Sequence, residues 1–162
     1  MTIGQSLLQE FDQEMATTRR VLERVPSDRG EWKPHPKSFA MGHLAQLLAW
    51  MPGWIDRTLT ATRLDLSKAG GYSFETTENL LQLFDQNVEK SRQALQGFPD
   101  SEWDTVWSLT RGDQVLWSAP RRVVVRNHIN HLVHHRGQMS VYLRLNDIPV
   151  PSMYGPSADE RM

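Results

Sequence analysis

The size and composition of the chain exclude several classes of protein. Its 162 residues match one ordinary domain, so we expect a single domain over residues 1–162. Lys and Arg total 18 and Asp and Glu total 19, a formal net charge of −1, whereas a nonspecific nucleic-acid binder carries a clear positive excess. The absence of cysteine excludes disulfides, thiolate metal sites and iron–sulfur clusters, which leaves histidine and carboxylate for any metal chemistry.

The N-terminal sequence and the apolar runs favour a cytoplasmic protein. An acidic residue occurs by position 10, which is unlike a secretory signal peptide. The longest apolar stretch, residues 44–55, is interrupted by Gln46, Pro52 and Gly53 and is too short to cross a bilayer. We therefore expect neither a membrane nor nucleic acid among the partners.

The first part of the chain predicts a helix followed by a loop. Apolar side chains spaced three and four residues apart predict an amphipathic helix over residues 3–25. Three prolines and a glycine in residues 26–37 are incompatible with a continuing helix, so they predict a structured loop.

A second helix is expected to follow this loop. Ser38 is a suitable N-cap for it, and the apolar pattern extends toward residue 59 or 64. Pro52 lies inside this helix and lacks a backbone donor, so we expect a kink near Ala49.

The middle of the chain predicts a third helix and then a hairpin. Thr76 or Thr77 is a suitable N-cap for a helix over about residues 75–95. Residues 103–117 differ in character, with three tryptophans and β-branched residues around Arg111-Gly112-Asp113. Their alternation predicts a short β-hairpin packed on the helices, with this triplet as its turn rather than as an adhesion motif.

The last part of the chain completes the predicted fold. Ser118 and Pro120 mark the start of a long helix that extends to about Asn146, and residues 149–162 are expected to be irregular. Four helical segments and one minor strand pair predict an all-α four-helix bundle with a short β-hairpin before the last helix.

Histidines are concentrated in this last helix. Four of the six lie within eight residues, at positions 128, 131, 134 and 135. At about 100° per residue, His131 and His135 share one face with His128 beside them, while His134 points the other way. Histidines at i and i+4 can bind one ion with two imidazoles. The same pair suits a hydrogen-bonded polar network in the core, and both interpretations stay open at this point.

A third metal ligand in a bundle has to come from a facing helix. His43 is the stronger candidate because it lies on the only other helix that carries a histidine, among apolar residues. His35 lies in a proline-rich loop and is the weaker candidate. We expect His134 at the surface and Arg136 as a solvated or inter-helix charge.

Three motifs carry a resemblance to a known family. They are GHL at 42–44, HLVHHRGQ at 131–138 followed by YLRL at 142–145, and the tail IPVPSMYGPSADE at 148–160. In this order they resemble the DinB/YfiT superfamily of metal-dependent enzymes, over nearly the whole chain. The resemblance implies a single DinB-like domain with the four-helix bundle of that superfamily, often as a homodimer. Carried over residue by residue, it implies that His43, His131 and His135 hold a divalent metal ion, nickel or zinc.

The resemblance also implies two kinds of activity. One is hydrolysis of a small-molecule substrate, and the other is transfer or isomerisation with a low-molecular-weight thiol such as bacillithiol, mycothiol or glutathione. Three neutral imidazoles leave a divalent ion its full charge and an open position, which lowers the pKa of a bound water toward about 7 or activates a thiolate. A metal-dependent hydrolase is the first expectation, with a thiol-dependent S-transferase or isomerase and a non-catalytic metal-binding bundle as alternatives.

Further residues are candidates for catalysis or substrate binding. No carboxylate has a spacing that marks it as a general base, so His128, at the edge of the ligand stripe, is a candidate proton acceptor or substitute ligand. Gln138 and Tyr142 are candidates to hydrogen-bond a ligand or a substrate. Trp50 and Trp54 are expected either to line a pocket or to pack in the core.

Overall fold

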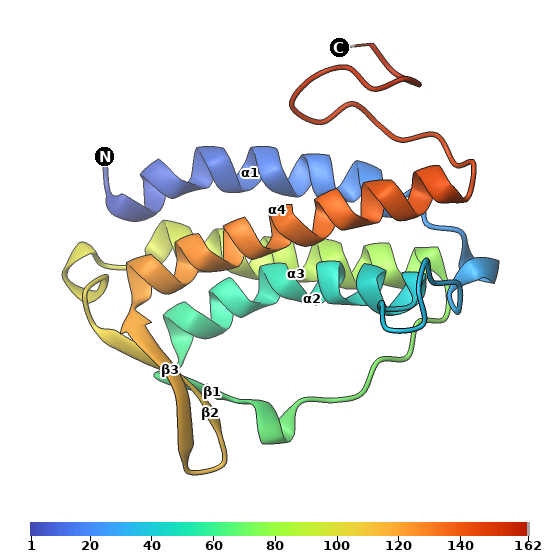
Figure 1. The fold of residues 1–162 in the computed structure, drawn as a ribbon. Coiled ribbons are helices and arrows are strands. Elements are labelled where there is room, and N and C mark those ends of the chain that lie inside the picture. The colour runs from blue at the N-terminus through green and yellow to red at the C-terminus, as the bar shows by residue number, and fades with distance from the viewer. Residues whose placement is uncertain (162) are drawn as a thin grey trace.

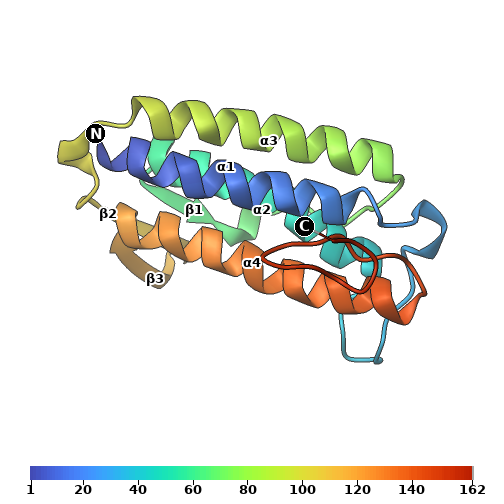
Figure 2. The ribbon, with the colours of Figure 1, turned by 90° about the horizontal axis from the view of Figure 1, so that it is seen from above.

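The computed structural model describes residues 1–161 and consists mainly of four helices; Met162 lies outside the described residues. The helices are α1 (Ile3–Leu22), α2 (Met41–Thr60), α3 (Thr77–Gly97) and α4 (Arg121–Leu145). They lie side by side in Figure 1, and the view from above shows α1 between α3 and α4 (Figure 2). Within residues 1–161, no helix has the length and apolar character needed to cross a membrane.

A small mixed sheet lies at the end of the molecule where α2 ends and α4 begins (Figure 1). Its strands are β1 (Arg63–Asp65), β2 (Val106–Arg111) and β3 (Gln114–Pro120), in the order β1-β2-β3. The antiparallel β2–β3 pair is the expected hairpin, and its turn contains Gly112 at a φ of 59°. The description as an all-α bundle with a hairpin is nevertheless incomplete, because β1 adds a third strand parallel to β2.

There is a physical reason why the sequence did not predict β1. β1 has only three residues, and its register pairs Leu64 with Leu109, far along the chain. So short a segment shows no hydrophobic period, and its pairing is decided by a distant strand. The sequence pattern instead extended the second helix toward residue 64, whereas α2 ends at Thr60.

The start of α2 also differs from expectation. Its N-cap is Ala40, which makes no side-chain cap, so the prediction of Ser38 as the cap was wrong. Carbonyl groups of the preceding loop provide the capping instead: the Met41 amide donates to Trp32 O at 2.7 Å and the Gly42 amide donates to Gly30 O at 2.9 Å. These bonds satisfy first-turn donors that a helix cannot satisfy itself. They also fix the helix turn that carries His43.

Pro52 lies inside α2, and α3 compensates for the disturbance. The buried Ser91 hydroxyl donates to Pro52 O at 2.6 Å and accepts from the Asp56 amide at 3.0 Å. It thus bridges two groups, four residues apart, that bond directly in a regular helix. Asn87 also donates its side-chain amide to Ala49 O at 2.9 Å. Side chains of α3 thus bond to backbone groups of α2 on both sides of Pro52, including Ala49, where the sequence predicted a kink, and α2 continues through the proline.

The remaining helix boundaries follow the sequence pattern closely. α3 begins after Thr76, whose hydroxyl accepts from the Asn79 amide at 3.2 Å. α4 begins after Pro120 and has Asn146 as its C-cap. The core between the helices is apolar, and fully burying one such large side chain contributes about 1.5–3 kcal/mol. Its largest fully buried members include Phe11, Leu48, Ile55, Phe84 and Trp103.

The C-terminal tail is irregular over its described residues, yet it is held in place. Two arginines of α1, Arg20 and Arg24, form ion pairs with Glu160. Arg144 of α4 pairs with Asp159 at 2.5 Å. These contacts explain why the tail lies over α1 and α4 in Figure 2.

Candidate metal centre

His131 and His135 form the centre of the candidate site. They lie one turn apart on α4, and their Nε2 atoms are 2.9 Å apart. Two nitrogens that bind the same zinc ion at about 2.0–2.1 Å are separated by about 2.9–3.4 Å, depending on the coordination angle. The pair therefore has the spacing of two ligands of one ion as well as that of a hydrogen bond.

Gln138 fixes the protonation of His135. Its Oε1 lies 2.7 Å from His135 Nδ1, so the imidazole donates its Nδ1 proton and keeps a lone pair on Nε2. The proton in the bond between the two rings therefore belongs to His131 Nε2. A partner on the second ring nitrogen is what orients histidines in metal sites.

Both imidazoles are neutral near pH 7. Burial lowers the pKa of His131, and the neighbouring His135 and His134 lower it further. Burial also lowers the pKa of His135, although its hydrogen bond to Gln138 acts in the opposite direction. A neutral imidazole is the form that binds a metal ion. His134 is exposed, as expected from the helical wheel.

His43 contacts aromatic side chains instead of this pair. Its ring centroid lies 3.5 Å from that of Tyr72 and 4.4 Å from that of Phe39. Burial lowers the pKa of His43 as well. Phe39 links the two parts of the site, because its ring is also 6.2 Å from that of His135. His35 lies exposed in the loop before α2.

The structure therefore gathers two of the three implied ligands. Among residues 1–161, no three His, Cys, Asp or Glu side chains are arranged to hold a metal ion together. His131 and His135 fit such an ion by the spacing of their Nε2 atoms and by their neutral charge, and His43 in its present position does not complete the set.

His128 makes a different bond and is 8% exposed. Its Nε2 lies 3.1 Å from Thr58 Oγ1, and that hydroxyl already donates its proton to Trp54 O at 2.8 Å. His128 must therefore donate its Nε2 proton to Thr58. Burial, with a smaller contribution from His131, lowers its pKa to about 4. This arrangement is typical of a neutral core histidine, and it removes Nε2 as a lone pair for a substitute ligand.

Tyr142 also has a partner of its own. Its hydroxyl donates to the backbone carbonyl of Phe39 at 3.1 Å, and its ring lies edge-on to Trp32 at 5.5 Å. Tyr142 thus fixes the position of Phe39, which lies between His43 and His135. It contacts the candidate site through the backbone of Phe39.

The sequence matches the DinB family over residues 1–161. The chain belongs to the DinB family. This membership confirms the resemblance carried by the histidine motifs and the tail.

Solved DinB-like proteins share the fold. A DinB-like protein from Bacillus cereus is 20% identical, with a TM-score of 0.73 over 91% of this chain and 95% of that one. The DinB-like protein YjoA from Bacillus subtilis is 16% identical, with a TM-score of 0.69 over 97% of this chain and 99% of that one. No curated protein matches the sequence.

Aromatic residues around the site of this DinB family member were only partly predicted. Trp54 lies beside His131 and His128, with ring centroids 6.0 and 5.7 Å away. Trp50 stacks on Tyr72 at 4.8 Å. Tyr72 had no detectable signal, because it lies in an irregular glycine- and serine-containing segment whose position depends on the fold.

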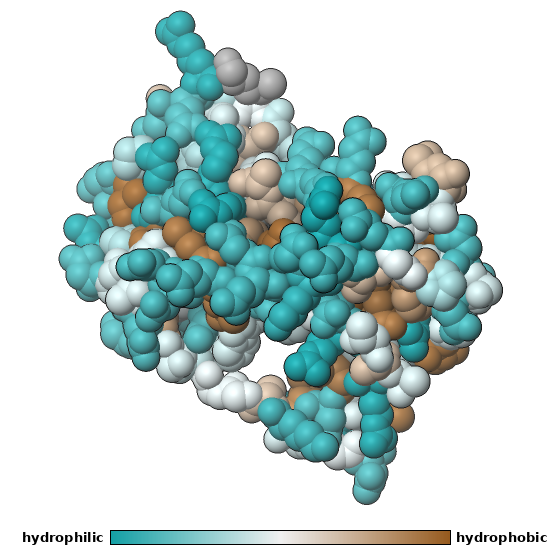
Figure 3. Space-filling model, turned by 180° about the vertical axis from the view of Figure 1, so that it is seen from behind, coloured by the Kyte–Doolittle hydropathy of each residue, from teal (hydrophilic) through white to brown (hydrophobic). Residues whose placement is uncertain are grey.

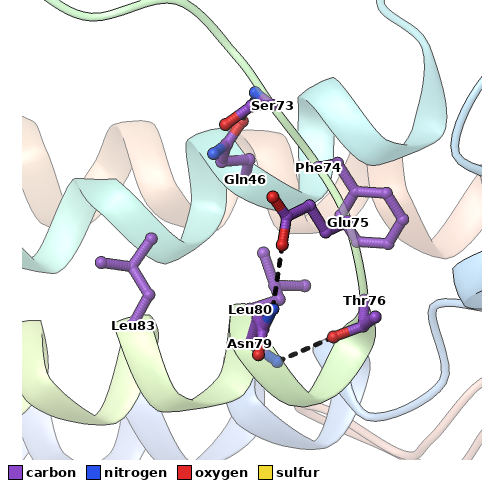
Figure 4. Close-up of a pocket in the computed structure, with 8 residues that line it drawn as sticks. All are labelled: Gln46, Ser73, Phe74, Glu75, Thr76, Asn79, Leu80 and Leu83. Atoms are coloured by element: carbon purple, nitrogen blue, oxygen red, sulfur yellow. Dashed lines mark hydrogen bonds between the residues drawn. The ribbon is translucent and has the colours of Figure 1, made fainter.

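A separate cavity lies between α2 and α3 and contains none of the candidate residues (Figure 4). Asn79 lines it and donates its side-chain amide to Glu75 Oε2 and its backbone amide to Thr76 Oγ1, each at 3.2 Å. The segment before α3 crosses this cavity and contributes Ser73 and Phe74 to its wall. The lining residues are Gln46, Ser73, Phe74, Glu75, Thr76, Asn79, Leu80 and Leu83.

Arg136, next to His135, belongs to a buried network on the other side of α4. Its side chain is 1% exposed and pairs with Glu14 of α1 at 2.7 Å. Tyr154 of the tail donates to both carboxylate oxygens of Glu14 at 2.9 Å. Arg136 is therefore an inter-helix charge, and its burial was not predicted.

Proposed function

We propose that this DinB family member is a metal-dependent enzyme that hydrolyses a small-molecule substrate. A divalent ion, nickel or zinc, would be held by His131 and His135 with His43 as the third ligand. The observation that carries the proposal is the 2.9 Å separation of the two Nε2 atoms, together with the Gln138 contact that orients His135.

The residues of the chain prepare this site before an ion binds. Gln138 keeps the Nε2 lone pair of His135 available, and the lowered pKa values keep both rings neutral. Only the proton on His131 Nε2 has to move for both lone pairs to face one ion. A divalent ion bound there supplies a Lewis acid that makes water a nucleophile near neutral pH.

Aromatic rings next to the histidine pair give the site an apolar surface. The Trp54 ring centroid lies 6.0 Å from that of His131, and the Phe39 ring centroid lies 6.2 Å from that of His135. Apolar side chains around a few polar groups are typical of small-molecule sites. We therefore place the substrate beside these two rings.

The first test is the metal content of tag-free protein, measured by plasma mass spectrometry. We expect about one equivalent of divalent metal in the wild type and none in a His131→Ala/His135→Ala double variant prepared identically. His134→Ala is the matched control, because it removes an exposed histidine from the same turn and should keep the wild-type content. A wild-type protein that stays empty after dialysis against nickel and zinc would overturn the proposal.

Activity is then assayed on the metal-loaded protein with ester and amide substrates, with and without a low-molecular-weight thiol. Hydrolysis without added thiol is the expected result. Turnover that requires glutathione or bacillithiol would replace the hydrolase with the thiol-dependent transferase, and a tightly bound metal without any turnover would favour a non-catalytic metal-binding protein.

A further inference from the structure

The segment between η2 (Leu66–Lys68) and α3 passes along α2 and contacts the third candidate ligand. In Figure 1 it runs below α2 on its way to α3. We call residues 69–76 the strap. Its tyrosine, Tyr72, lies on His43, while the rest of the candidate site lies on α4.

One end of the strap is firmly attached to the bundle. Phe74 packs on Gly42, where a Cβ atom would come within 2.6 Å of the phenylalanine ring, so only glycine allows this approach. The Ser73 amide donates to Gln46 Oε1 at 2.8 Å. Figure 4 shows Phe74 and Ser73 on this part of the strap, above the start of α3.

The other end of the strap is loosely held. A Cβ atom at Gly70 or Gly71 would meet nothing within 4 Å. The space-filling view shows an open gap between this lower segment and the helices (Figure 3). At these two glycines the strap is therefore bordered by open space, whereas Phe74 is packed against α2.

Tyr72 fills a gap between two aromatic side chains of α2. His43 and Trp50 are seven residues apart, so they share a face and lie about 10.5 Å apart along the helix. The Tyr72 ring lies between them, with its centroid 3.5 Å from His43 and 4.8 Å from Trp50. Tyr72 is still 42% exposed, so these ring contacts hold it at a surface that it can leave.

Two rings therefore contact His43: Tyr72 of the strap, and Phe39, which also lies near His135. We propose that Tyr72 is a positioning residue for the third ligand: its ring holds the His43 imidazole away from His131 and His135 until an ion binds. Binding then exchanges the Tyr72–His43 stack for a His43–metal bond, and the glycine end of the strap moves. This inference rests on the metal site of the proposed function.

The test compares zinc affinities of metal-free full-length variants, measured by competition with a chromophoric chelator. Tyr72→Ala removes the stack that zinc otherwise has to break, so we expect it to bind zinc about three- to tenfold more tightly than the wild type, the equivalent of one aromatic pair. Tyr72→Phe keeps the ring and should match the wild type. In a His43→Ala background, Tyr72→Ala should have no effect, because the third ligand is absent.

Hydrogen exchange provides a second readout that does not depend on a variant. Peptides covering the strap should exchange faster in wild-type protein after zinc is added, and this change should be absent in Tyr72→Ala. Equal zinc affinity in wild type and Tyr72→Ala, or weaker binding in the variant, would overturn the role of Tyr72 while leaving the metal site intact. If no variant binds zinc, the proposed function and the role of Tyr72 both fail.

Discussion

Two sides of α4 carry clusters of polar residues that differ in their bonding partners. On one side, Arg136 is 1% exposed and bonds to Glu14, Thr18 and Tyr154. On the other side, the half-buried His131 and the buried His135 lie within hydrogen-bond distance of each other, and His135 also bonds to Gln138. Residues adjacent in sequence, His135 and Arg136, thus belong to two unrelated clusters.

The difference between these clusters concerns charge and spare bonding capacity. The Arg136 cluster contains the Arg136–Glu14 ion pair, and its members come from α1, α4 and the tail, so it joins three parts of the chain. The histidine cluster is neutral and has lone pairs that can bind a ligand. A buried network whose polar groups all have hydrogen-bond partners is typical of a structural role. Polar groups that keep free lone pairs beside aromatic rings are typical of a ligand-binding site.

The largest expected effect is on stability, in the Arg136 cluster. Glu14→Ala leaves a buried guanidinium without its carboxylate, and breaking a buried pair in this way costs about 3–5 kcal/mol. Urea denaturation measures the loss.

Glu10→Ala is the matched control for Glu14→Ala. It breaks the exposed Arg126–Glu10 pair between the same two helices and should cost less than about 1 kcal/mol. Glu14→Gln, which keeps a hydrogen-bond acceptor, should be milder than Glu14→Ala. Equal losses in Glu14→Ala and Glu10→Ala would remove the structural role assigned to the cluster.

The next effect concerns pH and His128. Burial lowers its pKa from 6.5 to about 4, so between these values the unfolded chain binds a proton that the folded chain does not. The contribution of His128 to stability is fully present above pH 6.5 and is lost as the pH falls to about 4, a change of about 3 kcal/mol.

A comparison with His128→Gln isolates this effect, because glutamine does not titrate and can still donate to Thr58. Denaturation curves at several pH values should show the wild type losing its advantage over the variant between pH 6.5 and 4. Parallel pH dependences would contradict the assignment of His128 as a neutral core residue.

The smallest of these effects concerns the affinity for metal. Gln138→Ala removes the acceptor that orients His135, and losing such a partner weakens metal binding by about 10- to 100-fold. Gln138 is exposed, so the free energy of unfolding should change by less than about 0.5 kcal/mol. Gln138→Glu keeps the acceptor oxygen and should bind zinc nearly as the wild type does. An unchanged zinc affinity in Gln138→Ala would show that Gln138 does not orient the ligand.

The sequence by itself determined the helices, the hairpin turn and the family. Periodic apolar residues and local caps such as Thr76 act over a few positions, so they are visible in one segment. The i, i+4 spacing likewise predicted that His131 and His135 share a face, because they lie on one helix.

Only the tertiary structure decided the contacts between segments that are distant in sequence. β1 pairs with a strand more than 40 residues away, and Arg136 becomes buried because Glu14 and Tyr154 reach it from both ends of the chain. Tyr72 lies on His43 because Phe74 fits the surface of Gly42. The physical reason is the same in each case: burial and partners depend on which surfaces meet, and no local pattern in the sequence encodes that.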